Sequence, residues 1–327
     1  MVDPQPFLSK SSQRGDIEKV RDLKPMALVS AWFGPWPAWL PLYLESVRAN
    51  RDVDWILVSD QPPPDDLPVN VSLIGTSLSG FLDRIGRCTG LDLSAIDAPY
   101  KLCDLKPTYG HVFQHELSSY RSYGHADIDV IFGDLRHFYT DEVLDRYDVI
   151  STHTNIISGH LAVFRNSDRV RLAYQRIRNW EALATDPNHH SLDEVGHCRV
   201  YRSRGLLNLR KLLWQTMFRE QFSTPDARLP WRDGSSKWPA TWYWNNGHLN
   251  NSADPGGCYP YLHFMAWHSN RYRDDGNAPW PQLERLAQVT ATEARANGFT
   301  ISPRGFMPLE MGRLGRQSCR YTDPHLG

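Results

Sequence analysis

Two aspartates set two residues apart are the chemical centre of this sequence. Asp127 and Asp129 lie in residues 123–134, among apolar side chains and glycines. On extended backbone, side chains two positions apart point to the same side, roughly 6–7 Å apart, so both carboxylates could converge on one divalent cation. Mg²⁺ and Mn²⁺ prefer oxygen ligands and keep positions open for phosphate oxygens. A bare Asp-x-Asp is also typical of a surface turn, but acids inside an apolar segment are costly unless paired or metal-bound.

Two motifs together resemble a known family. Residues 100–107 read Tyr-Lys-Leu-Cys-Asp-Leu-Lys-Pro, and residues 124–135 read Gly-His-Ala-Asp-Ile-Asp-Val-Ile-Phe-Gly-Asp-Leu. This pair resembles a family of bacterial and viral glycosyltransferases of the GT-A type, many of them without an assigned substrate. The resemblance covers residues 24–271. It implies metal-dependent use of a nucleotide-diphosphate sugar, with a UDP-sugar as the expected donor, Mn²⁺ or Mg²⁺ as cofactor, and a glycan or other hydroxyl compound as acceptor.

The resemblance also implies a third metal ligand. His263 lies in the apolar segment 259–268 and resembles the C-terminal histidine that completes the metal site in many relatives. Neutral imidazole binds Mn²⁺ well beside two carboxylates. A lone histidine in an apolar strand is more often structural, and His268 is the alternative ligand. We therefore predict a metal site of Asp127, Asp129 and His263, in which Asp127 holds the metal, a water or the donor ribose.

Two lysines precede the aspartate pair. Lys101 and Lys106 lie just before a helix that we expect to begin at Pro107. Either lysine could neutralise a diphosphate as a point charge, helped by the helix N-terminus, although both could also be solvated surface residues. Relatives carry a basic residue near this point, which favours Lys106. Asp104 is expected to hold a lysine in place or to bind donor hydroxyls.

Two further segments extend the predicted site. Gly159 and His160 open an apolar strand that resembles the family segment bordering the donor sugar, where a glycine lets the backbone approach a ligand closely. His160 could equally be a structural hydrogen-bonding residue. Asp193 and Glu194 lie where similar enzymes carry an acceptor-side carboxylate, which can act as general base. Alternatively, Ser191 and Glu194 form a capping box for the helix that follows.

The order of the predicted elements indicates an α/β fold. Apolar runs at 26–33, 54–59 and 69–74 predict buried strands, and residues 40–47 and 78–86 predict amphipathic helices. This order is typical of a mixed, mostly parallel central sheet flanked by helices, similar to GT-A and Rossmann-like folds. Ligands bind beyond the carboxyl ends of such strands. We therefore place Ala31, Trp32 and Asp60 in the donor site with the aspartates.

We expect four regions along the chain. Residues 1–23 form a polar leader, 24–165 the nucleotide-sugar-binding half, and 166–280 the acceptor-side half of the same domain. Residues 281–327 add a C-terminal helix, expected over 282–297, and an irregular tail. An aromatic strand at 241–244 enters an Asn-Gly hairpin turn, and its Trp242 and Trp244 could stack on a sugar or belong to the core.

Composition limits the classes of function. The 327 residues carry a formal net charge of −1, which argues against nucleic-acid binding. No apolar run is long enough to span a membrane, so a cytoplasmic location is expected, with the inner membrane face as a possible peripheral site. Five scattered cysteines make a disulfide framework or zinc site unexpected. The sequence leaves the oligomeric state open.

Three other functions compete with glycosyl transfer. An Asp-x-Asp phosphotransferase would use Asp127 as nucleophile, but such enzymes usually place a small hydroxyl residue soon after the pair, and Val130-Ile131-Phe132 follows here. A metal-dependent nuclease fits poorly with a chain that is not basic. A non-catalytic carbohydrate- or nucleotide-binding protein of the same fold would keep the site but show no turnover. Retention or inversion of the sugar configuration stays open.

Overall fold

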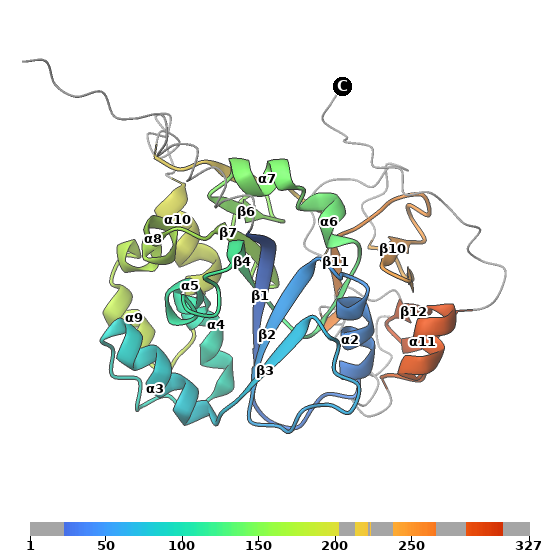
Figure 1. Ribbon diagram of the computed structural model, residues 1–327, viewed down its shortest axis with the longest axis horizontal. Helices are drawn as coiled ribbons and strands as arrows, with labels where there is room; N and C mark the ends of the chain where they lie inside the picture. Colours follow the sequence, from blue (N-terminus) through green and yellow to red (C-terminus); the bar gives the residue numbers. More distant parts are fainter. Residues whose placement is uncertain (1–22, 203–212, 222, 224–237, 266–285, 310–327) are drawn as a thin grey trace, which may run out of the picture.

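A seven-stranded sheet forms the centre of the computed structural model, which describes residues 23–202, 213–221, 223, 238–265 and 286–309. The strand order is β3-β2-β1-β4-β7-β6-β8 (Figure 1). The strands are β1 (Lys24–Trp32), β2 (Val53–Ser59), β3 (Val71–Gly75), β4 (Tyr120–Ala126), β6 (Val149–Ser151), β7 (Leu161–Arg165) and β8 (Thr216–Phe218). In this sheet β7 runs antiparallel to both neighbours, and the other pairs are parallel. The predicted mixed, mostly parallel sheet is confirmed.

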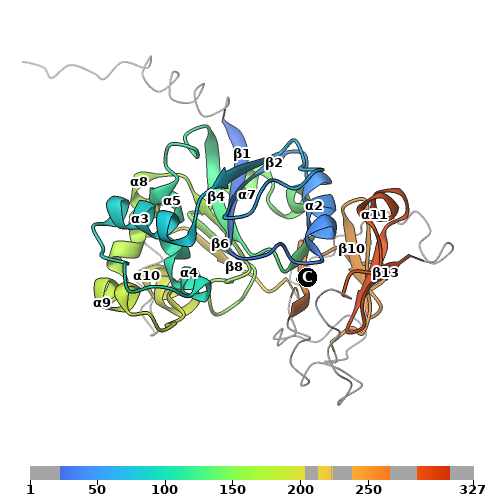
Figure 2. The same cartoon turned by 90° about the horizontal axis from the view of Figure 1, so that it is seen from below.

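One face of the sheet is covered by helices that follow β3 and β7. Ala27 and Val29 of β1 point to this face and pack in one buried cluster with Phe81 and Tyr109. The covering elements are α3 (Leu78–Thr89), α4 (Leu102–Leu105), α5 (Tyr109–Val112), α8 (Asp168–Arg171), α9 (Trp180–Thr185) and α10 (His197–Tyr201). They gather on one side of the sheet in both views (Figures 1 and 2).

The opposite face carries the alternate residues of the same strands. Met26 and Leu28 pack there with Tyr43 and Val47, which is the alternation expected of a strand buried on both faces. The elements of this face are α2 (Leu40–Arg48), β5 (Val130–Phe132), α6 (Leu135–Phe138), α7 (Asp141–Arg146) and β11 (Tyr261–His263). β11 pairs with β5 in a separate two-stranded sheet.

A smaller sheet lies beside α2 (Figure 2). It consists of β9 (Trp242–Asn245), β10 (His248–Asn251), β12 (Phe299–Ser302) and β13 (Gly305–Pro308), with α11 (Ala291–Asn297) against it. Its core contains Trp242 and Trp244, both buried. These tryptophans are therefore core residues, and neither is available to stack on a sugar.

Three expectations about local structure are wrong. The helix expected to begin at Pro107 is a series of short pieces, 3₁₀ turns at Pro99–Lys101 and Lys106–Thr108 alternating with α4 and α5. The long helix expected after Ser167 breaks into α8, a 3₁₀ turn at Ala173–Arg176, and α9. Residues 299–308, directly after α11, are not irregular as expected, because β12 and β13 complete the smaller sheet.

The cysteines also differ from expectation at one position. Cys88, Cys103 and Cys198 are not in disulfides, whereas Cys258 is disulfide-bonded. Cys258 lies between β10 and β11, where the small sheet joins the strand that carries His263.

In the part of the chain that the structure describes, every helix is too short or too polar to cross a membrane.

Candidate active site at the carboxyl ends of the central strands

The parallel strands of the central sheet end at a common edge. β1 ends at Trp32, β2 at Ser59 and β4 at Ala126, and antiparallel β7 begins at the same edge after Gly159 and His160. Asp127 directly follows β4, and its backbone N–H donates to the carbonyl oxygen of His160 at 3.1 Å. The topology therefore gathers side chains from distant parts of the sequence here.

The aspartate pair lies in a bend and not on extended backbone. Ile128 and Asp129 occupy bend positions between β4 and β5. Two contacts fix this bend: the Ile128 side chain is buried, and the indole N–H of Trp39 donates to the Ile128 carbonyl at 2.9 Å. Asp127 and Asp129 consequently face different partners.

Asp127 is held by a buried lysine. Lys106 Nζ lies 2.5 Å from Asp127 Oδ1, donates to the Gly159 carbonyl at 2.9 Å, and lies 3.8 Å from Asp193 Oδ2. Burial alone would lower the pKa of Lys106, but the nearby acidic groups, Asp127 first, outweigh it, so the pKa is raised. Burial would raise the pKa of Asp127, yet Lys106 and His160 lower it. Both groups stay charged, and the ammonium faces two carboxylates.

Asp129 faces a histidine from a distant strand. Nε2 of His263 lies 3.1 Å from Asp129 Oδ2. His160 and His263 stack with ring centroids 3.7 Å apart, and Nδ1 of each ring is buried without a hydrogen-bond partner. The structure therefore brings Asp127, Asp129, His160 and His263 together.

A divalent cation fits part of this arrangement. Donor atoms on one octahedral cation with bonds of about 2.1 Å lie roughly 3 Å apart, which matches the separation of Asp129 and His263. Asp127, Asp129 and His263, all described residues, do not form a compact three-ligand group, because no choice of one ligand atom from each brings all three within 4.8 Å of one another. Asp127 Oδ1 is instead held by Lys106. Asp129 and His263 are thus the residues positioned to hold the ion, and His268 lies outside the described residues.

Lys101 does not reach the site. Its side chain is fully buried, and Nζ donates to Asp104 Oδ2 at 2.8 Å and to the carbonyls of Leu183 at 2.8 Å and Asn188 at 2.7 Å. All three ammonium donors are used inside the protein. The prediction that Lys101 neutralises the donor diphosphate is therefore wrong.

Asp104 is also committed to internal partners. Besides Lys101, its carboxylate accepts from the backbone N–H groups of His190 and Leu192, each at 2.7 Å. Asp104 therefore holds a lysine, which is one of the two interpretations expected, and its carboxylate is fully buried among these partners.

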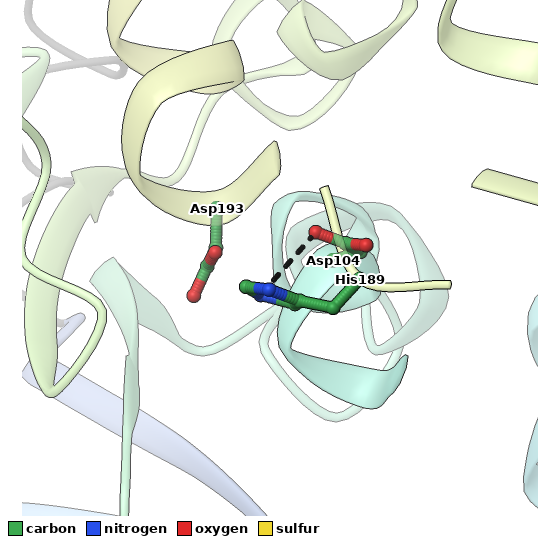
Figure 3. A group of neighbouring side chains, drawn as sticks. All are labelled: Asp104, His189 and Asp193. Atoms are coloured by element: carbon green, nitrogen blue, oxygen red, sulfur yellow. Dashed lines mark ion pairs between the residues drawn. The ribbon is translucent and has the colours of Figure 1, made fainter. Parts of the chain in front are cut away.

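Asp104 belongs to a second cluster that could in principle hold a metal. Ligand atoms of Asp104, His189 and Asp193 lie within 4.8 Å of one another, and the His189 ring extends toward Asp193 (Figure 3). Because both Asp104 oxygens already accept hydrogen bonds, this cluster offers a cation few free ligand atoms.

Asp193 is a buried acid beside Lys106. Its residue is 3% exposed and Oδ1 has no hydrogen-bond partner. Burial raises the pKa of Asp193 to about 7, although Lys106 opposes the shift. A carboxylate with this pKa can accept a proton near neutral pH.

The capping-box interpretation of Ser191 and Glu194 is wrong. Ser191 has a positive φ of 53° and makes no side-chain cap hydrogen bond to the π-helical turn Leu192–Gly196. Gly159 instead lies against the two acids: a Cβ there would approach Glu194 Oε1 to 2.8 Å and Asp193 Oδ2 to 3.2 Å. The glycine gives room to these carboxylates.

The described residues at the ends of β1 and β2 make no hydrogen bond to Asp127, Asp129 or Lys106. Ala31 and Trp32 are half-buried, and the Trp32 indole N–H donates to the Pro35 carbonyl at 3.0 Å. Asp60 is exposed, and its Oδ1 accepts from the Gly34 N–H at 3.0 Å and from Gln61 at 2.9 Å. Asp60 orders the loop after β1, and a direct donor contact by these three residues stays a prediction.

Sequence reasoning missed one pair near the site. His153 Nδ1 lies 3.3 Å from Glu220 Oε2, and the His153 ring packs edge-on against His160 at 6.2 Å. No motif surrounds either residue, and they meet only because β8 pairs with β6.

A family model matches residues 28–310, and its description is a family of unknown function (DUF6625). The chain belongs to this family. No curated protein matches it. Membership in DUF6625 assigns no activity.

Several solved structures of glycosyltransferases are similar to this DUF6625 member, at low sequence identity and low TM-score. They include galactosyltransferase LgtC in complex with donor and acceptor sugar analogs, at 11% identity and a TM-score of 0.37, covering 61% of this chain and 75% of that one. The apo form of the glycosyltransferase GlyE of Streptococcus pneumoniae TIGR4 is 11% identical with a TM-score of 0.33, and the match covers 61% of this chain and 46% of GlyE. Mouse xyloside xylosyltransferase 1 is 9% identical with a TM-score of 0.33, and the match covers 50% of this chain and 72% of that protein. We draw neither substrate nor mechanism from similarities this low.

Proposed function

We propose that this protein is a metal-dependent glycosyltransferase that moves a sugar from a nucleotide-diphosphate sugar to an acceptor hydroxyl. The observation that carries the proposal is the buried ammonium of Lys106, held between Asp127 and Asp193 at the carboxyl ends of the central strands. Beside it, Asp129 and His263 offer oxygen and nitrogen ligands at a spacing suited to Mn²⁺ or Mg²⁺. A fixed ammonium with a metal position beside it is suited to a diphosphate leaving group.

Each residue has a role in this proposal. Asp129 and His263 would hold the cation, which would supply Lewis-acid stabilisation of the departing diphosphate. Lys106 adds a fixed positive charge and orients Asp127, which faces the ribose, a water or the metal. The half formed by residues 24–165 supplies Asp127 and Asp129, and the half formed by 166–280 supplies Asp193 and His263.

Asp193 is the proposed base of an inverting reaction. The acceptor oxygen attacks the anomeric carbon, the bond from that carbon to the diphosphate oxygen breaks, and the acceptor proton passes to an oxygen of Asp193. The pKa of about 7 leaves much of Asp193 ionised at neutral pH. Glu194 beside it is the second carboxylate to test as the base of an inverting reaction. In a retaining reaction neither Asp193 nor Glu194 would have this role.

The phosphotransferase alternative fits the contacts less well. A nucleophilic Asp127 would have to attack through Oδ2, because Oδ1 is bound by Lys106, and the small hydroxyl residue that such enzymes usually place soon after the pair is absent from the sequence. A binding protein without turnover would share the donor site, so only a measurement of turnover separates it from an enzyme.

Thermal shift with a panel of nucleoside diphosphates, with and without Mn²⁺, tests the donor site. We expect metal-dependent stabilisation by at least one of them, with UDP as the first choice. Release of nucleoside diphosphate from a panel of nucleotide-sugars then tests turnover, with water as acceptor. Stabilisation without any release would identify a binding protein, and no stabilisation by any nucleotide would overturn the proposal.

A further inference from the structure

Tyr100 is an exposed aromatic residue beside the proposed site. Among the described residues, the large hydrophobic side chains with high exposure are Val69, Tyr100, Leu213 and Met307, and Tyr100 is the aromatic one, at 67% exposure. Its ring packs against His189 with centroids 4.8 Å apart and planes tilted by 52°. Exposing an aromatic ring in this way costs hydrophobic free energy, and nothing in the fold itself requires it.

Buried bonds hold the Tyr100 backbone and the His189 segment together. The next residue, Lys101, is fully buried and binds the carbonyl of Asn188, which precedes His189. Its partner Asp104 binds the N–H of His190, which follows His189. A single ion pair thus fixes the chain on both sides of His189 and directly after Tyr100, so the two rings form a preorganised surface.

This aromatic surface adjoins the proposed base. Ligand atoms of His189 and Asp193 lie within 4.8 Å (Figure 3), and Asp104 also binds the N–H of Leu192, which precedes Asp193. Burial raises the pKa of the Tyr100 phenol, and the charges of Cys103, Asp193 and Glu194 raise it further. Tyr100 and His189 are therefore close to Asp193.

We infer that Tyr100 and His189 form the acceptor platform, and that the acceptor is a pyranose. This inference rests on the proposed function and names the acceptor class for the same site. The C–H groups of a pyranose pack on the electron-rich face of an aromatic ring, while a ring hydroxyl of the acceptor is directed toward the Asp193 carboxylate beside His189. An acyclic polyol has the hydroxyls but no C–H face, so it binds poorly.

Saturation-transfer NMR with simple probes tests this platform without any turnover. The probes are methyl β-D-galactopyranoside, methyl β-D-glucopyranoside and methyl α-D-mannopyranoside, with D-glucitol as the acyclic control. We expect at least one pyranoside to bind through its C–H face, at least about tenfold more tightly than glucitol. Tyr100→Ala should remove this binding and Tyr100→Trp should keep it, whereas Tyr243→Ala, a half-exposed tyrosine on β9, should leave it unchanged.

The catalytic readout is the partition between transfer and hydrolysis of the donor. With a bound pyranoside, Tyr100→Ala should lower the ratio of glycoside product to hydrolysed donor by about tenfold, and Tyr100→Trp should restore it. Equal affinity of the Ala variant and the unchanged protein for every pyranoside would overturn the platform. If pyranosides bind at Tyr100 but no donor is hydrolysed, the platform stands and the proposed transferase activity fails.

Discussion

The imidazole rings of His160 and His263 stack at 3.7 Å, and each ring faces a different aspartate of the pair. His160 Nδ1 lies 3.6 Å from Asp127 Oδ2, and His263 Nε2 lies 3.1 Å from Asp129 Oδ2. Burial and the neighbouring His263 lower the pKa of His160 to about 4, so His160 is neutral at pH 7. The stack therefore divides the site into an Asp127 half bound to Lys106 and an Asp129 half able to hold a cation.

Loss of either residue of the Asp129 half should weaken metal binding. Removing a group that only supports a metal ligand typically costs 10–100-fold in affinity, and a direct ligand should cost at least as much. We therefore expect Asp129→Asn and His263→Ala each to weaken Mn²⁺ binding by about tenfold or more, measured by the electron paramagnetic resonance signal of free Mn²⁺. The control is His248→Ala on the exposed end of β10. If His263→Ala binds Mn²⁺ as tightly as the unchanged protein, His263 is not a metal ligand and His268 becomes the first candidate.

Lys106→Met should destabilise the fold because it leaves Asp127 without its partner. Removing one member of a buried pair costs about 3–5 kcal/mol, and Asp127 retains some exposure, so we expect about 3 kcal/mol in urea unfolding. Asp127→Asn in the Lys106→Met background should recover much of this loss. A strictly additive double variant would show that the two groups are not coupled in the folded protein.

Lys101→Met should act on stability, since Lys101 has only internal partners. It would leave the buried Asp104 carboxylate uncompensated, at a cost of about 3–5 kcal/mol. The affinity for a nucleoside diphosphate, measured by calorimetry well below the melting temperature, should stay close to that of the unchanged protein. A stable Lys101→Met variant that has lost nucleotide affinity would restore Lys101 as a donor ligand.

Asp193 should make stability depend on pH in a defined direction. Its folded pKa of about 7 lies above the ordinary 3.8, so the folded state keeps a proton that the unfolded chain has lost. The contribution of Asp193 to the free energy of unfolding therefore falls by up to about 4 kcal/mol as the pH rises from about 4 to about 7. Above pH 7 this contribution stays constant. The groups acting on Asp193 are Lys106, Glu194, Asp127 and Asp104.

Urea unfolding at pH 5 and pH 8 checks this dependence. Asp193→Asn should lose the fall between the two values, and Glu194→Gln should keep most of it. In the same variants, transfer should drop by about 10²–10⁴ for Asp193→Asn if it is the base. An identical pH dependence in Asp193→Asn and the unchanged protein would show that Asp193 does not hold the extra proton.

Gly159→Ala should displace the side chains of Asp193 and Glu194 while leaving the fold intact. The new methyl group meets the ends of the Glu194 and Asp193 side chains, which can rotate away, so we expect a melting temperature within a few degrees of the unchanged protein. Transfer should fall by about tenfold or more because the base is displaced. Gly75→Ala is the matched control, since its Cβ would meet no atom within 4 Å. Full activity in Gly159→Ala would argue against a carboxylate at this position in the reaction.

The sequence predicted the elements whose pattern is local. The buried strands β1 and β2 and the helices α2 and α3 follow from apolar runs and a 3.6-residue period, and the Asn-Gly turn predicted the β9–β10 hairpin. The segments after Pro107 and after Ser167 carry helical patterns as well, but they pack on the sheet as short pieces. Tertiary contacts decide where such patterns break, and a local period does not contain them.

The sequence by itself determined which side chains could do chemistry: the aspartate pair, the two lysines, His160, His263 and the Asp193–Glu194 pair. Only the tertiary structure decided that Lys106 faces Asp127 while Lys101 is closed inside with Asp104. It also brought His153 to Glu220 and Tyr100 to His189. The physical reason is that charge and residue type are properties of a position, whereas burial and partners depend on segments that meet only when the sheet is complete.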